Sequence, residues 1–342
     1  MNVERFVFIL TANLGVAALT ACQGGGIAPT VSPASQVPTA RIVDRAASGD
    51  LYVANGKSNS VTVYGSDTNL KYRIKLKGAP RVLTLDTSGN IYVADSGGAS
   101  GEVVEYGADS RKVLRTITDG INRPFSLAFD ASGNLYVANH LSRGQKGSVT
   151  VYPPTGTTML REITDGVSRP ISVTFDKNSN LYVLNSGTTN VTVYALGAST
   201  PKETISDKIE HPLTMAYGND RLFVGNNPKP VNVYTHDAKL AKQISKDVLK
   251  PAALTIGSGN LFVANSEAGT VTAYNAQTGK HLRTISKGTA SPTSLALDHS
   301  GFVYVGNPPA NNVTVYAPAS GGVVRTYSTD ISDPVSLAVG PR

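Results

Sequence analysis

The sequence predicts an all-β fold, a seven-bladed β-propeller of four-stranded blades, from two repeated patterns and the turns between them. The first pattern, Leu-Tyr-Val-Ala-Asn or a close variant, recurs at intervals of 39 to 46 residues, with a mean of 42. Its copies begin at Leu51, Ile91, Leu135, Leu181, Leu222, Leu261 and Val303. The second pattern, Val-x-x-Tyr, follows each copy and ends at Tyr64, Tyr106, Tyr152, Tyr194, Tyr234, Tyr274 and Tyr316.

Both patterns are short, alternate in polarity and are rich in β-branched and aromatic residues, which is typical of strands. A third strand type precedes the first pattern, as in 124–130 and 292–298, and a weaker fourth follows the tyrosine, as in 113–117. Turn sequences such as Ser-Gly-Asn at 88–90 separate the strands. Four short strands every 42 residues predict a propeller. No run with the 3.6-residue period of an α-solenoid occurs.

The end of the chain predicts how the ring closes. Residues 334–339 copy the strand that opens each blade, but no second strand follows them. We expect this C-terminal strand to supply the innermost strand of the blade that begins at Leu51, because closure protects exposed strand edges. Residues 41–44 are a poorer candidate for that position.

Composition excludes several classes of protein. The 342 residues are 40% hydrophobic and 16% charged, without several long apolar blocks, which disfavours a disordered chain and a multi-span membrane protein. One cysteine excludes an intramolecular disulfide framework and a multi-cysteine zinc site. The formal charge of +7 favours anionic surfaces or ligands without specifying one.

The N-terminus resembles a bacterial lipoprotein signal peptide over residues 1–21. Arg5 precedes an apolar stretch from Phe6 to Leu19, which is too short to span a membrane comfortably, and Leu-Thr-Ala leads to Cys22. The resemblance implies that Cys22 becomes the mature N-terminus and carries a diacylglycerol on its thiol. An ordinary secretory signal with a chance cysteine is the alternative.

The resemblance also implies a location in the cell envelope. Gln23 stands where an aspartate would indicate retention in the inner membrane, so the outer membrane is expected. Residues 22–40 are rich in Gly, Ser, Pro and Thr and predict a flexible tether. Residues 41–342 are assigned to the propeller.

The blade sequence Pro-x-Ser-Leu-Ala-x-Asp, Leu-Tyr-Val-Ala-Asn and Val-Thr-Val-Tyr resembles the NHL and YVTN class of propeller repeats over residues 45–340. The chain has no tryptophan, which argues against WD40 repeats and quinoprotein propellers. The resemblance implies little about function, because such blades serve as binding platforms and also as hydrolase or lyase scaffolds.

Residues repeated in every blade are best explained by structure. A tyrosine ends the third strand of every blade, which predicts that these rings pack in the core. An Asn or Asp also ends each second strand, and short polar side chains usually bond their own turn. These residues are Asn55, Asp95, Asn139, Asn185, Asn226, Asn265 and Asn307.

Function is therefore expected where the blades differ. The residue before the proline that opens each blade is Ala79, Arg123, Arg169, His211, Lys250, Ser291 and Asp333 in turn. We call Arg123, Arg169, His211 and Lys250, on four consecutive blades, the basic arc. The loops that leave the second strands reach the same face and add His140, Arg143, Lys146 and Lys229. The arc could bind a carboxylate, phosphate or sulfated sugar. Alternatively, these cations are merely solvated loop residues.

An enzyme is the alternative function. Lactonase-like and streptogramin-lyase-like propellers place a metal, or a His and Glu pair, at the mouth of the channel. Here Glu210 and His211 are adjacent, Glu267 lies on a loop of the next blade, and His140 lies two blades earlier. A histidine beside carboxylates can act as a general base. Ca²⁺ or Mg²⁺ is expected only for this alternative, and otherwise no metal or cofactor is predicted.

The sequence thus favours a lipid-anchored interaction module of the cell envelope, most simply a monomer. Its membrane contact is the lipid on Cys22, and its partner is an envelope protein or an anionic glycan. Nucleic acid is an unfavourable partner, because the chain has an export signal and lacks aromatic residues interleaved with the basic arc.

Overall fold

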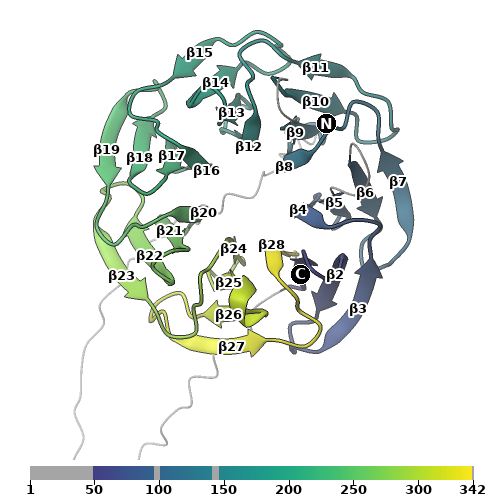
Figure 1. The fold of residues 1–342 in the computed structure, drawn as a ribbon, viewed down its shortest axis with the longest axis vertical. Coiled ribbons are helices and arrows are strands. Elements are labelled where there is room, and N and C mark those ends of the chain that lie inside the picture. Colours follow the sequence, from purple (N-terminus) through teal and green to yellow (C-terminus); the bar gives the residue numbers. More distant parts are fainter. Residues whose placement is uncertain (1–48, 96–100, 141–145, 341–342) are drawn as a thin grey trace, which may run out of the picture.

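The predicted seven-bladed propeller is confirmed by a computed structural model, which describes residues 49–95, 101–140 and 146–340. Within these ranges 28 strands form seven four-stranded antiparallel sheets arranged as a ring (Figure 1). None of the helices in these ranges is long and apolar enough to cross a membrane. The predicted lipid site Cys22, the tether and Arg143 lie outside the described residues.

Each blade is listed from the propeller axis outward. Blade 1 contains β28 (Pro334–Val339), β1 (Leu51–Asn55), β2 (Ser60–Tyr64) and β3 (Leu70–Lys75). Blade 2 contains β4 (Pro80–Leu85), β5 (Ile91–Asp95), β6 (Glu102–Tyr106) and β7 (Val113–Ile117). Blade 3 contains β8 (Pro124–Phe129), β9 (Leu135–Asn139), β10 (Ser148–Tyr152) and β11 (Arg161–Ile163). Blade 4 contains β12 (Pro170–Phe175), β13 (Leu181–Asn185), β14 (Asn190–Tyr194) and β15 (Glu203–Ile205).

The remaining blades follow the same plan. Blade 5 contains β16 (Pro212–Gly218), β17 (Arg221–Asn226), β18 (Val231–Thr235) and β19 (Leu240–Ile244). Blade 6 contains β20 (Pro251–Gly257), β21 (Asn260–Asn265), β22 (Thr270–Asn275) and β23 (His281–Ile285). Blade 7 contains β24 (Ser294–Leu297), β25 (Val303–Asn307), β26 (Asn312–Tyr316) and β27 (Val323–Tyr327), with the 3₁₀ turn η1 (Pro308–Ala310) between β25 and β26.

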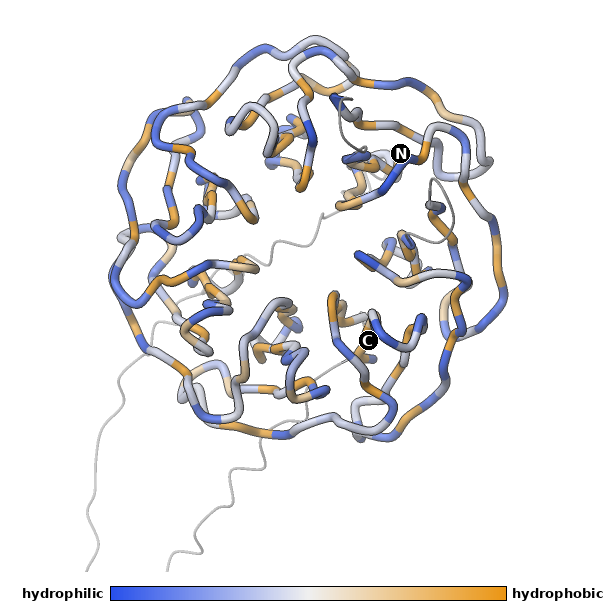
Figure 2. The backbone as a smooth tube through the Cα atoms, in the orientation of Figure 1, coloured by the Kyte–Doolittle hydropathy of each residue, from blue (hydrophilic) through white to orange (hydrophobic). Residues whose placement is uncertain are grey.

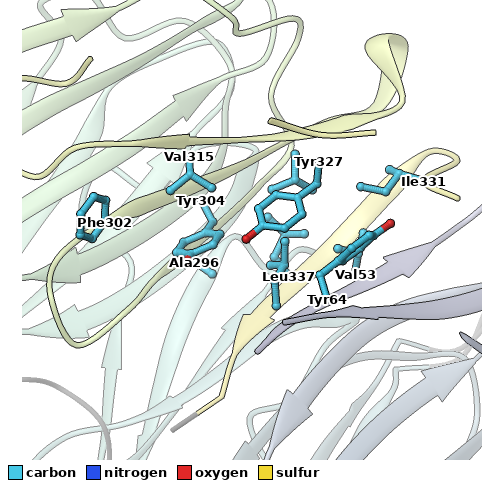
Figure 3. Close-up of a cluster of buried hydrophobic side chains, with 11 residues drawn as sticks. Val53, Tyr64, Ala296, Phe302, Tyr304, Val315, Tyr327, Ile331 and Leu337 are labelled. Carbon is cyan, nitrogen blue, oxygen red and sulfur yellow. The ribbon is translucent and has the colours of Figure 1, made fainter. Parts of the chain in front are cut away.

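The C-terminal strand closes the ring as predicted. β28 pairs antiparallel with β1, with Leu51 opposite Val339 and Asn55 opposite Pro334. Figure 3 shows the buried cluster at this seam, where side chains of blades 7 and 1 pack together. The rings of Tyr64 and Tyr327 lie 5.1 Å apart between centroids. The two ends of the propeller are therefore joined by backbone pairing and by a shared core.

The hydrophobic core is divided among the boundaries between blades. Polar and apolar residues alternate along much of the chain (Figure 2), so that each sheet has apolar side chains to bury. Seven buried clusters form, and each combines residues of two neighbouring blades. A single blade cannot bury its faces alone, so stability comes from stacking the repeats.

The repeated tyrosines are structural, as predicted, and their hydroxyl groups have a further role. Six of the seven tyrosines on the third strands donate a hydrogen bond to a backbone carbonyl in the loop that crosses into their blade. The pairs are Tyr64 with Thr329, Tyr152 with Asp119, Tyr194 with Asp165, Tyr234 with Asp207, Tyr274 with Lys246 and Tyr316 with Lys287. Each of these six tyrosines therefore fills the core and also fixes a connection between blades.

The buried Asn or Asp at the end of each second strand is also structural. Its side-chain oxygen accepts a backbone N–H from the loop that leads to the proline of the same blade, a contact that sequence reasoning did not anticipate. The pairs are Asn55 with Ser332, Asp95 with Gly78, Asn139 with Asn122, Asn185 with Ser168, Asn226 with Glu210, Asn265 with Leu249 and Asn307 with Ala290. The expected bond within the turn also occurs, for example from Asn185 to Asn190. These residues position the loops that lead to the prolines, including the four loops that carry the basic arc.

Candidate functional site

The basic arc lies on the face of the ring where the inner strands begin, which we call the proline face. Here the residue before the proline has a left-handed backbone in six of the seven blades, with φ between 46° and 57°. The exception is Ala79 of blade 2. The residue before a proline usually adopts an extended conformation, and a positive φ is unfavourable for residues other than glycine. The six are Arg123, Arg169, His211, Lys250, Ser291 and Asp333.

Backbone hydrogen bonds hold these residues between the loops of two neighbouring blades. The N–H of Arg169 donates to the carbonyl of Lys146 in blade 3, and its own carbonyl accepts the N–H of Ser186 in blade 4. Lys250 repeats the arrangement, donating to Pro228 of blade 5 and accepting from Ser266 of blade 6. The positions of the arc residues are therefore set by main-chain contacts and do not depend on their side chains.

The side chains of the basic arc are exposed and uncompensated. Arg123, Arg169, His211 and Lys250 are all exposed. In the part of the chain that the structure describes, none of these four side chains takes part in a hydrogen bond or an ion pair. The pre-proline residues Ser291 and Asp333 of blades 7 and 1 are only partly exposed. The proline face thus presents exposed basic side chains on four adjacent blades.

The other predicted ligand-binding residues have different environments. His140 is only 8% exposed, and its ring stacks on Phe125 with centroids 4.4 Å apart. Its Nε2 lies 3.5 Å from the hydroxyl of Ser186 in the next blade. Lys146 is exposed, as is Lys229 between two prolines. His140 therefore supports neighbouring side chains, while the two lysines extend the charge of the basic arc.

Sequence reasoning missed Arg81 and Phe125. Arg81 is the second residue of β4, and its guanidinium carbon lies 3.9 Å from the centroid of the Phe125 ring on the adjacent inner strand. A signal was present in the sequence, because Arg81 is the only charged residue at this position of the seven repeats. The contact itself joins two blades and could not be read from one repeat.

The residues of the enzyme alternative are not assembled into a reactive group. Glu210, His211 and Glu267 are all exposed, and no hydrogen bond or ion pair within the described ranges links His211 to either glutamate. His140 is buried two blades away. Across residues 49–95, 101–140 and 146–340, no cluster of three or more His, Cys, Asp or Glu residues is placed to hold a metal ion.

One cavity lies on the face opposite the basic arc, and a second lies beside the residues that precede Lys250. The first, of about 130 Å³, is lined by the turns after the inner strands of blades 6 and 7, including Ser258 and His299. These turns are on the face opposite the arc, because the inner strands run from one face to the other. A more open hollow of about 490 Å³ lies beside Asp247 and Thr270 of blade 6. No member of the basic arc lines either cavity.

Comparison with known proteins shows the fold alone. No protein-family model matches the chain, and no curated protein matches it. A functionally unknown protein from Desulfotomaculum acetoxidans is similar with a TM-score of 0.71 and 13% identity, over 86% of this chain and all of the other. A protein from Lactobacillus plantarum has a TM-score of 0.69 and 17% identity, over 85% of this chain and 98% of its own. The computationally designed protein Ika8 has a TM-score of 0.64 and 14% identity, over 84% of this chain and 90% of its own.

Proposed function

We propose that this chain is a binding module of the cell envelope whose proline face holds a ligand with several negative charges, such as an anionic glycan or an acidic region of an envelope protein. The proposal rests on the basic arc. Its four basic side chains lie on adjacent blades, are exposed, and have no described hydrogen-bond or ion-pair partner. Uncompensated charges of one sign attract an oppositely charged ligand and position it.

The backbone at the basic arc supports this function. Arg123, Arg169 and Lys250 have φ values of 51°, 51° and 52°. Glycine would adopt this conformation at lower cost, whereas a larger residue loses on the order of 1 kcal/mol. Ser291 and Asp333 share this backbone, so the feature specific to the basic arc is the choice of a basic side chain at a strained position. Long cationic side chains at strained positions are explained if a ligand needs them.

Removing two arc charges tests the proposal. We expect the double variant Arg123→Ala/Arg169→Ala to bind a heparin-derived oligosaccharide about tenfold or more weakly, since each charge-assisted contact contributes about 1.5–3 kcal/mol. Binding of the full-length chain is measured by calorimetry at several salt concentrations. The matched control is Lys239→Ala/Lys280→Ala, which removes the same charge from exposed turns on the opposite face. Equal binding by the arc variant and the wild type would refute the proposal.

We further propose that the chain is a lipoprotein with propeller repeats of the NHL and YVTN type, anchored at Cys22, in the outer membrane if the host has one. The support is the resemblance of residues 1–21 to a lipoprotein signal, the single cysteine at its end, and the repeated blade sequence. The tether at 22–40, at about 3.3 Å per residue, could hold the propeller up to roughly 60 Å from the lipid.

Metabolic labelling with a palmitate analogue tests the anchor. We expect label on the wild-type protein and none on Cys22→Ser, which lacks the acceptor thiol. When the same cells are fractionated, the variant should appear in the soluble fraction and the wild type in the membrane fraction. Label retained by Cys22→Ser would contradict the assignment of the lipid site.

A further inference from the structure

Arg81 breaks the pattern of the inner strands. The second residue of the inner strand, directly after the proline in the repeat, is uncharged in the other six blades: Phe125, Ile171, Leu213, Ala252, Thr293 and Val335. In blade 2 it is an exposed arginine. The fold does not require a charge at this position, because the other six blades have an uncharged residue there.

A stack of side chains from two blades holds the Arg81 guanidinium. Its central carbon lies 3.9 Å from the centroid of Phe125, within the range of a cation–π contact. Phe125 in turn stacks on the nearly buried His140, with 21° between the ring planes. His140 lies beside Ser186 of blade 4. The guanidinium is therefore held in place by packing, and a ligand would lose little side-chain entropy on binding it.

The charge of Arg81 has no described counter-charge. In the ranges that the structure covers, no carboxylate forms an ion pair with Arg81 or Arg123, and neither guanidinium donates a hydrogen bond to the protein. Partial burial, together with the positive charge of Arg123, lowers the pKa of Arg81. Arg123 belongs to the same place in the fold, because its backbone carbonyl accepts the N–H of His140, whose ring stacks on Phe125. Like charges on neighbouring arginines repel each other. An anion between them would remove the repulsion and accept several N–H donors.

We propose that Arg81 and Arg123 form a specific oxyanion site, which receives a sulfate ester or carboxylate group of the ligand at the edge of the stack made by Phe125 and His140. This inference rests on the proposed function, since it names the subsite at which the anionic ligand is read. The basic arc supplies general attraction, whereas the fixed guanidinium of Arg81 supplies directional hydrogen bonds.

Variants of Arg81 separate directional recognition from net charge. Arg81→Met removes the charge and the donors, while Arg81→Lys keeps the charge and removes the planar guanidinium. Full-length variants are titrated with a heparin-derived oligosaccharide, which carries sulfate esters, and with a galacturonate oligosaccharide, which carries only carboxylates. We expect both variants to weaken binding about tenfold to whichever probe the wild type binds more tightly, and that preference identifies the oxyanion. Thermal unfolding checks that each variant is folded.

Phe125→Leu provides a second test that leaves every charge in place. The leucine cannot stack on the guanidinium, so we expect affinity to fall about fivefold with the same dependence on salt. Wild-type affinity in Arg81→Lys and Phe125→Leu would overturn the oxyanion site. If Arg123→Ala/Arg169→Ala still weakened binding, the proposed function would stand without this subsite. If the wild type bound neither probe, both proposals would fail.

Discussion

Two sets of basic side chains in this propeller have the same charge and different uses. On the outermost strands, Arg115 forms an ion pair with Glu105 at 2.5 Å, with both side chains less than a tenth exposed. The same guanidinium donates to the carbonyls of Pro153 and Gly156 in the next blade. On the proline face, Arg123 has no such partner among the described residues. The outer cation contacts the protein, whereas the inner one has no described hydrogen-bond or ion-pair partner.

The outer arrangement recurs around the ring. Arg283 donates to the carbonyls of Pro318 and Ala319, and Arg325 donates to Ser66. Lys242 likewise donates to Gln277 and Thr278. In each case a cation on an outer strand binds the turn between the third and fourth strands of the next blade. Position within the blade therefore decides whether a basic residue joins blades or faces solvent.

The largest expected effect is unfolding at high pH, when the buried tyrosines of the third strands ionise. Both sets of cations would then lose the fold that positions them. Burial raises the pKa of Tyr106, Tyr152, Tyr234 and Tyr316 to about 12. In the unfolded chain these groups ionise near pH 10, so their contribution to stability is complete below pH 10 and is lost as the pH rises to 12. We expect cooperative unfolding in this window, followed by circular dichroism and by tyrosinate absorbance.

The variant Tyr152→Phe is the control for this titration, because it removes one ionisable group. After allowance for any difference in stability at neutral pH, the variant should reach the midpoint of alkaline unfolding at a higher pH than the wild type. A chain that stays folded at pH 12 with its tyrosines ionised would contradict the explanation.

The next largest effect distinguishes the two sets of cations directly. Arg115→Ala leaves Glu105 buried without its partner, and breaking a buried ion pair typically costs about 3–5 kcal/mol. We expect urea unfolding to show a loss of this size, with unchanged affinity for the anionic oligosaccharide. Arg115→Ala/Glu105→Ala should recover part of the loss, since no unpaired charge remains. A loss below about 1 kcal/mol would show that the outer cations do not join the blades.

The smallest effect concerns the strained backbone of the basic arc. Arg123→Gly and Arg123→Ala remove the same charge, but only glycine adopts a φ of 51° without strain. We expect the glycine variant to be about 1 kcal/mol more stable than the alanine variant in urea unfolding. At Ala79, which lies outside the left-handed region, Ala79→Gly should instead destabilise by about 0.5–1 kcal/mol. Equal effects at the two positions would remove strain as an argument for function.

The repeated sequence was a good guide to the fold and to the placement of the basic arc. The interval between Leu51 and Ile91, repeated along the chain, determines the number of blades. The unpaired copy at 334–339 predicted the closing strand, which pairs with β1. Arg123 and Arg169 lie on the expected face because successive antiparallel strands alternate in direction. Each of these inferences needed only local pattern and strand direction.

The site itself was less predictable. His140 was predicted as a ligand-binding residue and is almost buried against Phe125. The role of Arg81 was not foreseen, because its neighbours belong to the next blade. The hydrogen bond from Ser168 to Asn185 likewise connects a loop to a strand end that one turn does not bring together. Sequence patterns within one repeat do not specify side-chain contacts between repeats.

The sequence by itself determined the strands, the seven blades, the closure and the positions of the basic residues, because alternation and period depend on neighbours along the chain. Only the tertiary structure decided which cations bind the protein and which have no partner among the described residues. The physical reason is packing between blades, which sets Arg115 against a turn of the next blade and sets Arg81 on Phe125 of the next blade.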